Sequence, residues 1–161
     1  MAAMGRSLQG VHNPQFKTAQ CRHALTGDAI HIRRVGRIAD PKAQGWIGSL
    51  LNNIGWAYYD KQDYARALDC FERDQKWFED RQKDEQARIA RYSIGKTLRA
   101  LGRIEEALAL QQKLKPDGYV LEEIAECLLA TGKTNDARTY FARAYELLSK
   151  DEWFVADEPQ R

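Results

Sequence analysis

The stretches Ile54-Gly55-x-x-Tyr58, Ile94-Gly95-x-x-Leu98 and Ile124-Ala125-x-x-Leu128 share one pattern, a small residue followed three positions later by a bulky apolar one. Twelve positions after each small residue stands an alanine, at Ala67, Ala107 and Ala137. A pattern that recurs along a chain is typical of stacked structural repeats. We therefore expect the stacked surface and its partner, rather than a single active site, to carry the function.

Six helices are predicted between Asp40 and residue 150, because apolar residues recur there at intervals of three and four. Asp40-Pro41 is a helix-start signal, and the second helix is expected to run to about Gln82. Gly102 is placed as the left-handed residue after the third helix, and Lys115-Pro116-Asp117-Gly118 predicts a turn. Since no alternating valine-rich run predicts a strand, we expect an all-α fold of three antiparallel helix pairs.

The small residues indicate where paired helices approach one another. Helix axes that lie roughly 8–10 Å apart require small side chains at the crossing point. Glycine inside a helix is unfavourable by about 0.5–1 kcal/mol relative to alanine, so its recurrence suggests a packing reason. We expect the small residue of the first helix to face the alanine of the second in each pair, as in Gly55 with Ala67.

The composition favours a soluble helical protein in a reducing compartment. The 161 residues are 43% hydrophobic and 30% charged, with a net charge of +2. No apolar run approaches the ~20 residues that span a bilayer. The three cysteines lie far apart, so we expect buried thiols rather than disulfides or a zinc site. The cytoplasm is the predicted location, with no membrane or nucleic-acid partner.

Three segments are predicted from the patterning. Residues 1–39 form a basic, loosely ordered arm with a net charge of +5, which leaves −3 for the remaining residues. An organellar transit peptide is the alternative for this arm, although glycine and proline interrupt any amphipathic helix. Residues 40–150 hold three repeats at about 46–82, 84–115 and 118–150, and residues 151–161 form a tail.

The sequence lacks the residue patterns of a catalytic centre. No HExxH, GxSxG or glycine-rich phosphate loop occurs, and all three histidines lie in the arm. Glu122, Glu123 and Glu126 are alternatively metal ligands or a solvated helix face, and the solvated face is favoured because no histidine is near. We therefore expect no enzyme activity, no metal and no cofactor.

The stretches 52–59 (NNIGWAYY) and 101–108 (LGRIEEAL) resemble the tetratricopeptide repeat family, whose unit is a helix–turn–helix of about 34 residues. The resemblance implies a right-handed α-solenoid. The steps from Gly55 to Gly95 and to Ala125 are 40 and 30 residues, which indicates an extended second helix and a shortened fourth. Arg91 and Gln111 stand where the family usually has bulky apolar residues.

The resemblance further implies a concave groove that holds a peptide or protein segment, lined by the first helix of each pair. The family's groove positions correspond here to Ser49, Asn52, Trp56, Tyr59, Ile89, Tyr92, Lys96, Arg99, Tyr119, Glu122, Glu126 and Leu129. Eight of these are expected to contact the ligand: Asn52, Trp56, Tyr59, Tyr92, Lys96, Arg99, Glu122 and Glu126. The predicted function is a non-catalytic interaction scaffold for a protein or peptide partner.

Structural alternatives remain for several of these residues. Trp56 and Tyr59 are alternatively packed against the arm or the preceding helix, and Lys96 and Arg99 alternatively pair with Glu122 and Glu126. A second function is a structural or self-associating repeat protein without a peptide ligand, monomeric or weakly dimeric. Its contact patch would combine Trp77-Phe78 with Trp153-Phe154-Val155, unless the tail aromatics fold back as a cap.

Overall fold

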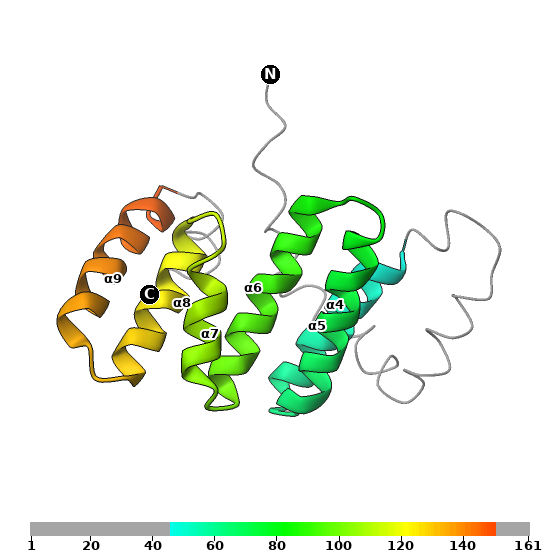
Figure 1. Cartoon of the computed structure of the whole chain (residues 1–161), viewed down its shortest axis with the longest axis horizontal. Helices are drawn as coiled ribbons and strands as arrows, with labels where there is room; N and C mark the ends of the chain where they lie inside the picture. Colours follow the sequence, from blue (N-terminus) through cyan, green and yellow to red (C-terminus); the bar gives the residue numbers. More distant parts are fainter. Residues whose placement is uncertain (1–45, 151–161) are drawn as a thin grey trace, which may run out of the picture. The chain divides into compact units, whose positions relative to one another are not determined.

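The computed structural model describes residues 46–150, which contain six helices and no strand. Figure 1 gives their order, with the labels used here. The prediction of an all-α helical repeat fold is confirmed, while the right-handed twist stays a prediction. The basic arm, the Asp40-Pro41 helix start and the Trp153-Phe154-Val155 tail lie outside the described residues. The helices are α4 (Ile47–Asp60), α5 (Tyr64–Glu79), α6 (Asp84–Ala100), α7 (Ile104–Gln111), α8 (Gly118–Ala130) and α9 (Thr134–Leu148).

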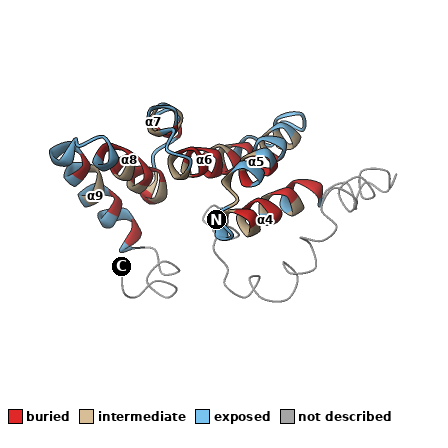
Figure 2. Cartoon of the chain, turned by 90° about the horizontal axis from the view of Figure 1, so that it is seen from below, coloured by how far each residue is buried: buried red, intermediate tan, exposed pale blue. Residues whose placement is uncertain are grey.

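The chain divides into two compact units, and the boundary falls inside α6 between Ile94 and Gly95. The described part of the first unit contains α4, α5 and the first part of α6. The second unit contains the end of α6 together with α7, α8 and α9. In both units buried and exposed residues alternate around the helices, as Figure 2 shows by colour. This is the pattern of amphipathic helices that share an apolar core.

In the first unit, α4 and α5 pack against each other around Gly55. A Cβ atom built at Gly55 would lie 2.5 Å from Cε1 of Phe71, whose side chain is fully buried. The three atoms nearest to that Cβ all belong to the Phe71 ring. The missing side chain at Gly55 thus accommodates the Phe71 ring, one turn further along α5 than Ala67, which is itself buried. The predicted facing of Gly55 and Ala67 stays a prediction.

The same relationship recurs in the second unit with a polar side chain. A Cβ atom at Gly95 would lie 2.5 Å from Nε2 of Gln111, and Gln111 is fully buried. Gln111 thus occupies the position of Phe71, sixteen residues after the small residue. Gln111 is therefore a polar residue at a buried position where the family usually has a bulky apolar one. The prediction of a short fourth helix is confirmed, since α7 has eight residues.

Four helix ends close with the same hydrogen-bonding pattern. Gly102 N–H donates to the carbonyl of Arg99 (2.9 Å) and Arg103 N–H to that of Leu98 (2.9 Å), the two bonds of a Schellman motif. Gly102 has φ +78°, which confirms its predicted left-handed conformation. The equivalent residues at the other three ends are Gln62 (φ 61°), Gln82 (φ 54°) and Gly132 (φ 78°).

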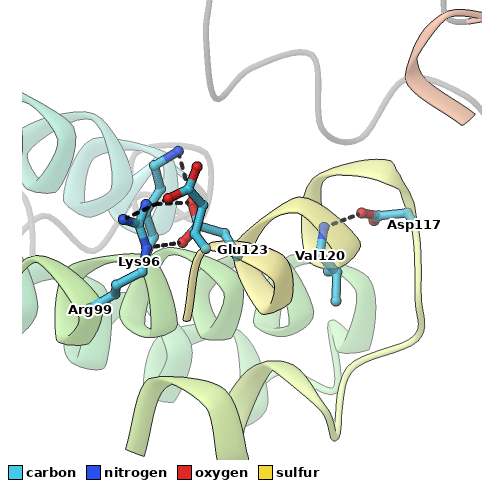
Figure 3. Close-up of polar contacts among 6 residues, drawn as sticks. Lys96, Arg99, Asp117, Val120 and Glu123 are labelled. Carbon is cyan, nitrogen blue, oxygen red and sulfur yellow. Dashed lines mark hydrogen bonds and ion pairs between the residues drawn. The ribbon is translucent and has the colours of Figure 1, made fainter. Parts of the chain in front are cut away.

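Aspartates cap two of the helix starts. The Asp63 carboxylate accepts a hydrogen bond from the N–H of Arg66 (3.2 Å), and the Asp117 carboxylate accepts one from Val120 (2.9 Å). Figure 3 shows the second cap. Each satisfies a backbone donor that has no partner inside the helix. The predicted turn at 115–118 therefore ends in the cap that starts α8.

The aromatic side chains at the end of α5 pack against α4 within the first unit. A Cβ at Gly48 would collide with the Phe78 ring and come within 2.9 Å of Trp77, so both side chains lie against the start of α4. The Arg81 guanidinium stacks 3.2 Å from the centre of the Trp77 ring and donates to the Trp77 carbonyl. The helix ends at Glu79 rather than at about Gln82. It is nevertheless twice as long as α7.

Candidate functional site

The predicted binding residues of α4 form one aromatic face in the first unit. Asn52, Trp56 and Tyr59 are spaced four and three residues apart, which places them on one side of the helix. All three are half-buried. The Trp56 ring lies edge-on to Tyr59 (5.3 Å between centroids) and to Phe71 (5.1 Å), so the face rests on the core ring that fills the space at Gly55.

Asn52 carries a hydrogen-bond acceptor that receives no donor from residues 46–150. Its Nδ2 atom donates a long hydrogen bond to Oδ1 of Asn53 (3.4 Å), whereas its own Oδ1 is buried and accepts none from this part of the chain. Buried polar atoms in native proteins are nearly always paired, so such an atom calls for an explanation. A backbone N–H of a bound segment is one donor of the right chemistry.

Tyr92 belongs to the core rather than to an open surface. It lies in the part of α6 that belongs to the first unit, and only 4% of its surface is exposed. Arg91, its neighbour, donates to Oε1 of Glu79 (2.6 Å). The arginine that replaces an apolar residue of the family pattern is therefore satisfied by a surface ion pair, while Tyr92 presents little area to a ligand.

In the second unit, Lys96 and Arg99 converge on a carboxylate from α8 (Figure 3). Arg99 donates from Nε to Oε2 of Glu123 (2.8 Å) and from Nη2 to Oε1 (3.2 Å). Lys96 Nζ lies 3.2 Å from the same Oε1. Arg99 also lies 3.7 Å from Glu126 through Nη1. The alternative of ion pairing is thus found, but with Glu123 as the main partner.

Glu123 is buried, which corrects the interpretation of a solvated acidic face. Only 2% of its surface is exposed, against 19% and 26% for the side chains of Lys96 and Arg99. Burial raises the pKa of the Glu123 carboxyl, but the Arg99 hydrogen bond and the charges of Lys96 and Arg99 lower it more, so the net pKa falls below 4.5. The buried carboxylate is therefore ionised and locked in place.

A signal for this burial was present in the sequence. Val120 and Cys127 lie three residues before and four residues after Glu123, on the same side of α8, and both are buried. A carboxylate within such an apolar stripe must find cations when the helix packs. Glu122 and Glu126, which the sequence did predict at the site, are half-buried beside it.

Metal binding finds no support within residues 46–150. No group of three or more histidine, cysteine, aspartate or glutamate side chains is arranged there to hold an ion. The three histidines lie outside the described residues. Cys70 and Cys127 are buried thiols, as predicted, and burial raises the pKa of Cys127 to about 11. At neutral pH this thiol is protonated and unreactive.

A second buried carboxyl, Asp74 on α5, has a different environment. It is buried, and its Oδ1 atom accepts no hydrogen bond from the described residues. Burial raises the pKa of Asp74 to about 8, and no charge within the described part of the chain offsets the effect. The residues at the same distance from the small residue in the other two repeats are Leu114 and Ala144, both apolar. Asp74 is therefore a polar residue at a core position.

Residues 48–74 match the family model of the tetratricopeptide repeat. This range covers most of α4 and the first part of α5, including the pattern around Gly55 and Ala67. Searches of curated proteins and of solved structures gave no match. None of the helices among residues 46–150 is long and apolar enough to cross a membrane. Residues 48–74 are therefore similar to a tetratricopeptide repeat, and the all-helical fold of residues 46–150 is consistent with that similarity.

Proposed function

We propose that the protein is a non-catalytic scaffold that holds a peptide or protein segment of a partner against the first helices of its repeats. The tetratricopeptide repeat indicates a protein–protein interaction module in general. The finer proposal concerns the residues: Asn52, Trp56 and Tyr59 in the first unit, and Lys96, Arg99, Glu122 and Glu126 in the second. We propose the reducing cytoplasm as the compartment.

The observation that carries the proposal is the face formed by Asn52, Trp56 and Tyr59. Half-buried aromatic rings offer a large contact area at a small loss of side-chain entropy, as binding hot spots do. Trp56 is held by Phe71 and Tyr59, so its orientation is fixed before a ligand arrives. Pre-organisation of this kind favours affinity. The Oδ1 atom of Asn52 supplies a polar acceptor beside the rings.

Peptide selection tests this proposal directly. Short random peptides displayed on phage are selected on the full chain, and the affinity of the best binder is compared between wild type and Trp56→Ala. Loss of a hot-spot tryptophan weakens binding by about 2 kcal/mol or more, roughly thirtyfold. Asn52→Ala removes only the polar acceptor and is expected to weaken binding by a smaller factor.

Tyr145→Ala is the matched control, because Tyr145 is an aromatic residue of α9 that is 67% exposed and outside the predicted groove. This variant is expected to bind with the wild-type affinity. Thermal unfolding of each variant separates lost binding from lost folding, since Trp56 also contacts Phe71. Equal affinity of wild type and a folded Trp56→Ala would rule out the α4 face as the binding surface.

Self-association is the second candidate, and exposed apolar residues of α9 favour it. Tyr145 and Leu147 are large side chains that are 67% and 48% exposed. Exposed apolar area of this sort marks interfaces when it is contiguous. Light scattering over a concentration series tests the idea, with Tyr145→Ala as the variant. A monomer at every concentration would contradict self-association and leave the peptide-binding proposal standing.

A further inference from the structure

The carboxylate of Glu123 holds the cations that an acidic ligand of the second unit would need. Arg99 offers it two parallel hydrogen bonds, at 2.8 and 3.2 Å, and Lys96 approaches to 3.2 Å (Figure 3). Paired donors from one guanidinium are the geometry that proteins use to bind carboxylates. The protein therefore already contains, in its own α8, the group that would otherwise come from a partner.

We propose that Glu123 sets the specificity of the interaction, by excluding partner segments that present a carboxylate to Lys96 and Arg99. The segment accepted on this face is uncharged or basic. This inference rests on the proposed binding function and adds the chemical class of the ligand. Glu123 is a positioning residue in this proposal, because it acts through the two cations and not through contact with the ligand.

Displacement of Glu123 by a ligand is unfavourable for a physical reason. An incoming carboxylate that took Arg99 and Lys96 would leave Glu123, which is 2% exposed, as a buried anion without its cations. Arg99 already lies near two carboxylates, Glu123 and Glu126, so a third carboxylate from a ligand would be repelled by both. Selectivity of this kind depends on penalties against the wrong partner, not only on attraction to the right one.

The surrounding charges act in the same direction. Lys96 and Arg99 contribute two positive charges, whereas Glu122, Glu123 and Glu126 contribute three negative ones. With Glu123 ionised, these five residues carry a net charge of −1. Replacement of Glu123 by glutamine would remove one negative charge, so that an external carboxylate would no longer compete with the Glu123 carboxylate for Lys96 and Arg99.

The test repeats the phage selection on full-length wild type, Glu123→Gln and Glu106→Gln. Glu106 is the matched control, since it pairs with Arg103 on the exposed surface of α7 and lies outside the proposed site. We expect peptides selected on wild type and on Glu106→Gln to be poor in aspartate and glutamate. We expect those selected on Glu123→Gln to be enriched in these residues, and the best of them to bind wild type about tenfold more weakly.

Two outcomes would overturn the inference: acidic peptides selected on wild type, or the same charge profile on wild type and Glu123→Gln. These outcomes differ from failure of the proposed function. In that case wild type selects no peptide, or its best peptide binds wild type and a folded Trp56→Ala with equal affinity. Selection of no peptide by any variant would reject both ideas together.

A measurement on wild type alone covers the case in which Glu123→Gln does not fold. The Nε–H resonance of Arg99 reports on its bond to Glu123, and a glutamate-only peptide is the probe. We expect this resonance to stay in place when the peptide is added at an ionic strength matched with sodium chloride. A saturable shift would show that an external carboxylate displaces Glu123 and would overturn the inference.

Discussion

Phe71 of α5 fills the space that the missing side chain of Gly55 leaves on α4. A Cβ atom at Gly55 would lie 2.5 Å from Cε1 and 2.8 Å from Cδ1 of this ring. The Phe71 ring in turn supports Trp56, 5.1 Å away. The glycine of the repeat pattern thus connects the packing of the helix pair to the face that we propose for binding.

Gly55→Ala is expected to destabilise the protein more than Gly95→Ala. Both changes gain up to about 1 kcal/mol of helix propensity, but overpacking a core costs typically 1–3 kcal/mol. At Gly55 the obstacle is a rigid, buried ring, whereas at Gly95 the nearest atom is the end of the Gln111 side chain, which can shift. Chemical denaturation of the two variants measures the difference, and equal stability would contradict the assigned packing.

Gln62→Gly is expected to stabilise the protein by roughly 0.5–1 kcal/mol. Gln62 has φ 61° at the position where Gly102 and Gly132 have φ 78°, so the same left-handed conformation is held by a residue that disfavours it. The reciprocal change, Gly102→Gln, is expected to lower the thermal midpoint. A destabilised Gln62→Gly would mean that the glutamine side chain contributes more than the backbone strain removes.

Asp74→Asn is expected to change how stability depends on pH. The pKa of Asp74 is about 8 in the folded chain and 3.8 when unperturbed, so the folded state binds the proton more tightly. The contribution of Asp74 to stability is therefore fully present below about pH 4 and falls by about 1.4 kcal/mol per pH unit until about pH 8. In the Asn variant this dependence is absent.

Denaturation at pH 5 and pH 7 measures this effect, because Glu123 stays ionised across that range. Asp69→Asn is the control, since Asp69 is exposed on the same helix and pairs with Arg73. We expect Asp69→Asn to follow the wild-type curve, while Asp74→Asn gains stability relative to it as the pH rises. Parallel curves for Asp74→Asn and wild type would show that Asp74 does not titrate in this range.

Glu123→Ala is expected to destabilise the protein by about 1–3 kcal/mol at neutral pH, because two partly buried cations lose their partner. The pKa of Glu123 is lowered in the folded chain, so its contribution is present at neutral pH and is lost as the pH falls below about 4.5. Glu106→Ala, at the exposed pair with Arg103, is expected to leave the thermal midpoint close to that of wild type. Similar losses at both positions would contradict a special role for Glu123.

The positions of the helix pairs and the conformation at Gly102 were predicted correctly from the sequence. Helical periodicity located the helix pairs, and the left-handed residue at Gly102 followed from the absence of a side chain. The shortness of α7 followed from the 30-residue step between Gly95 and Ala125. The first two features depend on neighbours within one or two turns of the chain, and the third on comparing the step with the family unit of about 34 residues. A single sequence is therefore enough to specify them.

The errors concern contacts between helices. Periodicity gives the inward side of α5 but not which side chain enters the space at Gly55, so the role of Phe71 was not predicted. Tyr92 was expected in the groove, yet its ring is buried. Glu123 was overlooked because its charge suggested solvent, although Val120 and Cys127 place it on an apolar stripe. Packing across helices decides these cases, and it is weakly encoded in spacing alone.

Nuclear magnetic resonance of the full chain offers the most direct test of peptide binding on α4. The protein has four tryptophans, so its spectrum contains four indole N–H signals, one of them from Trp56. Titration with the best selected peptide should shift the Trp56 signal saturably and leave that of Trp77, which packs under Arg81, in place. Saturable binding that leaves the Trp56 signal unmoved would contradict the account.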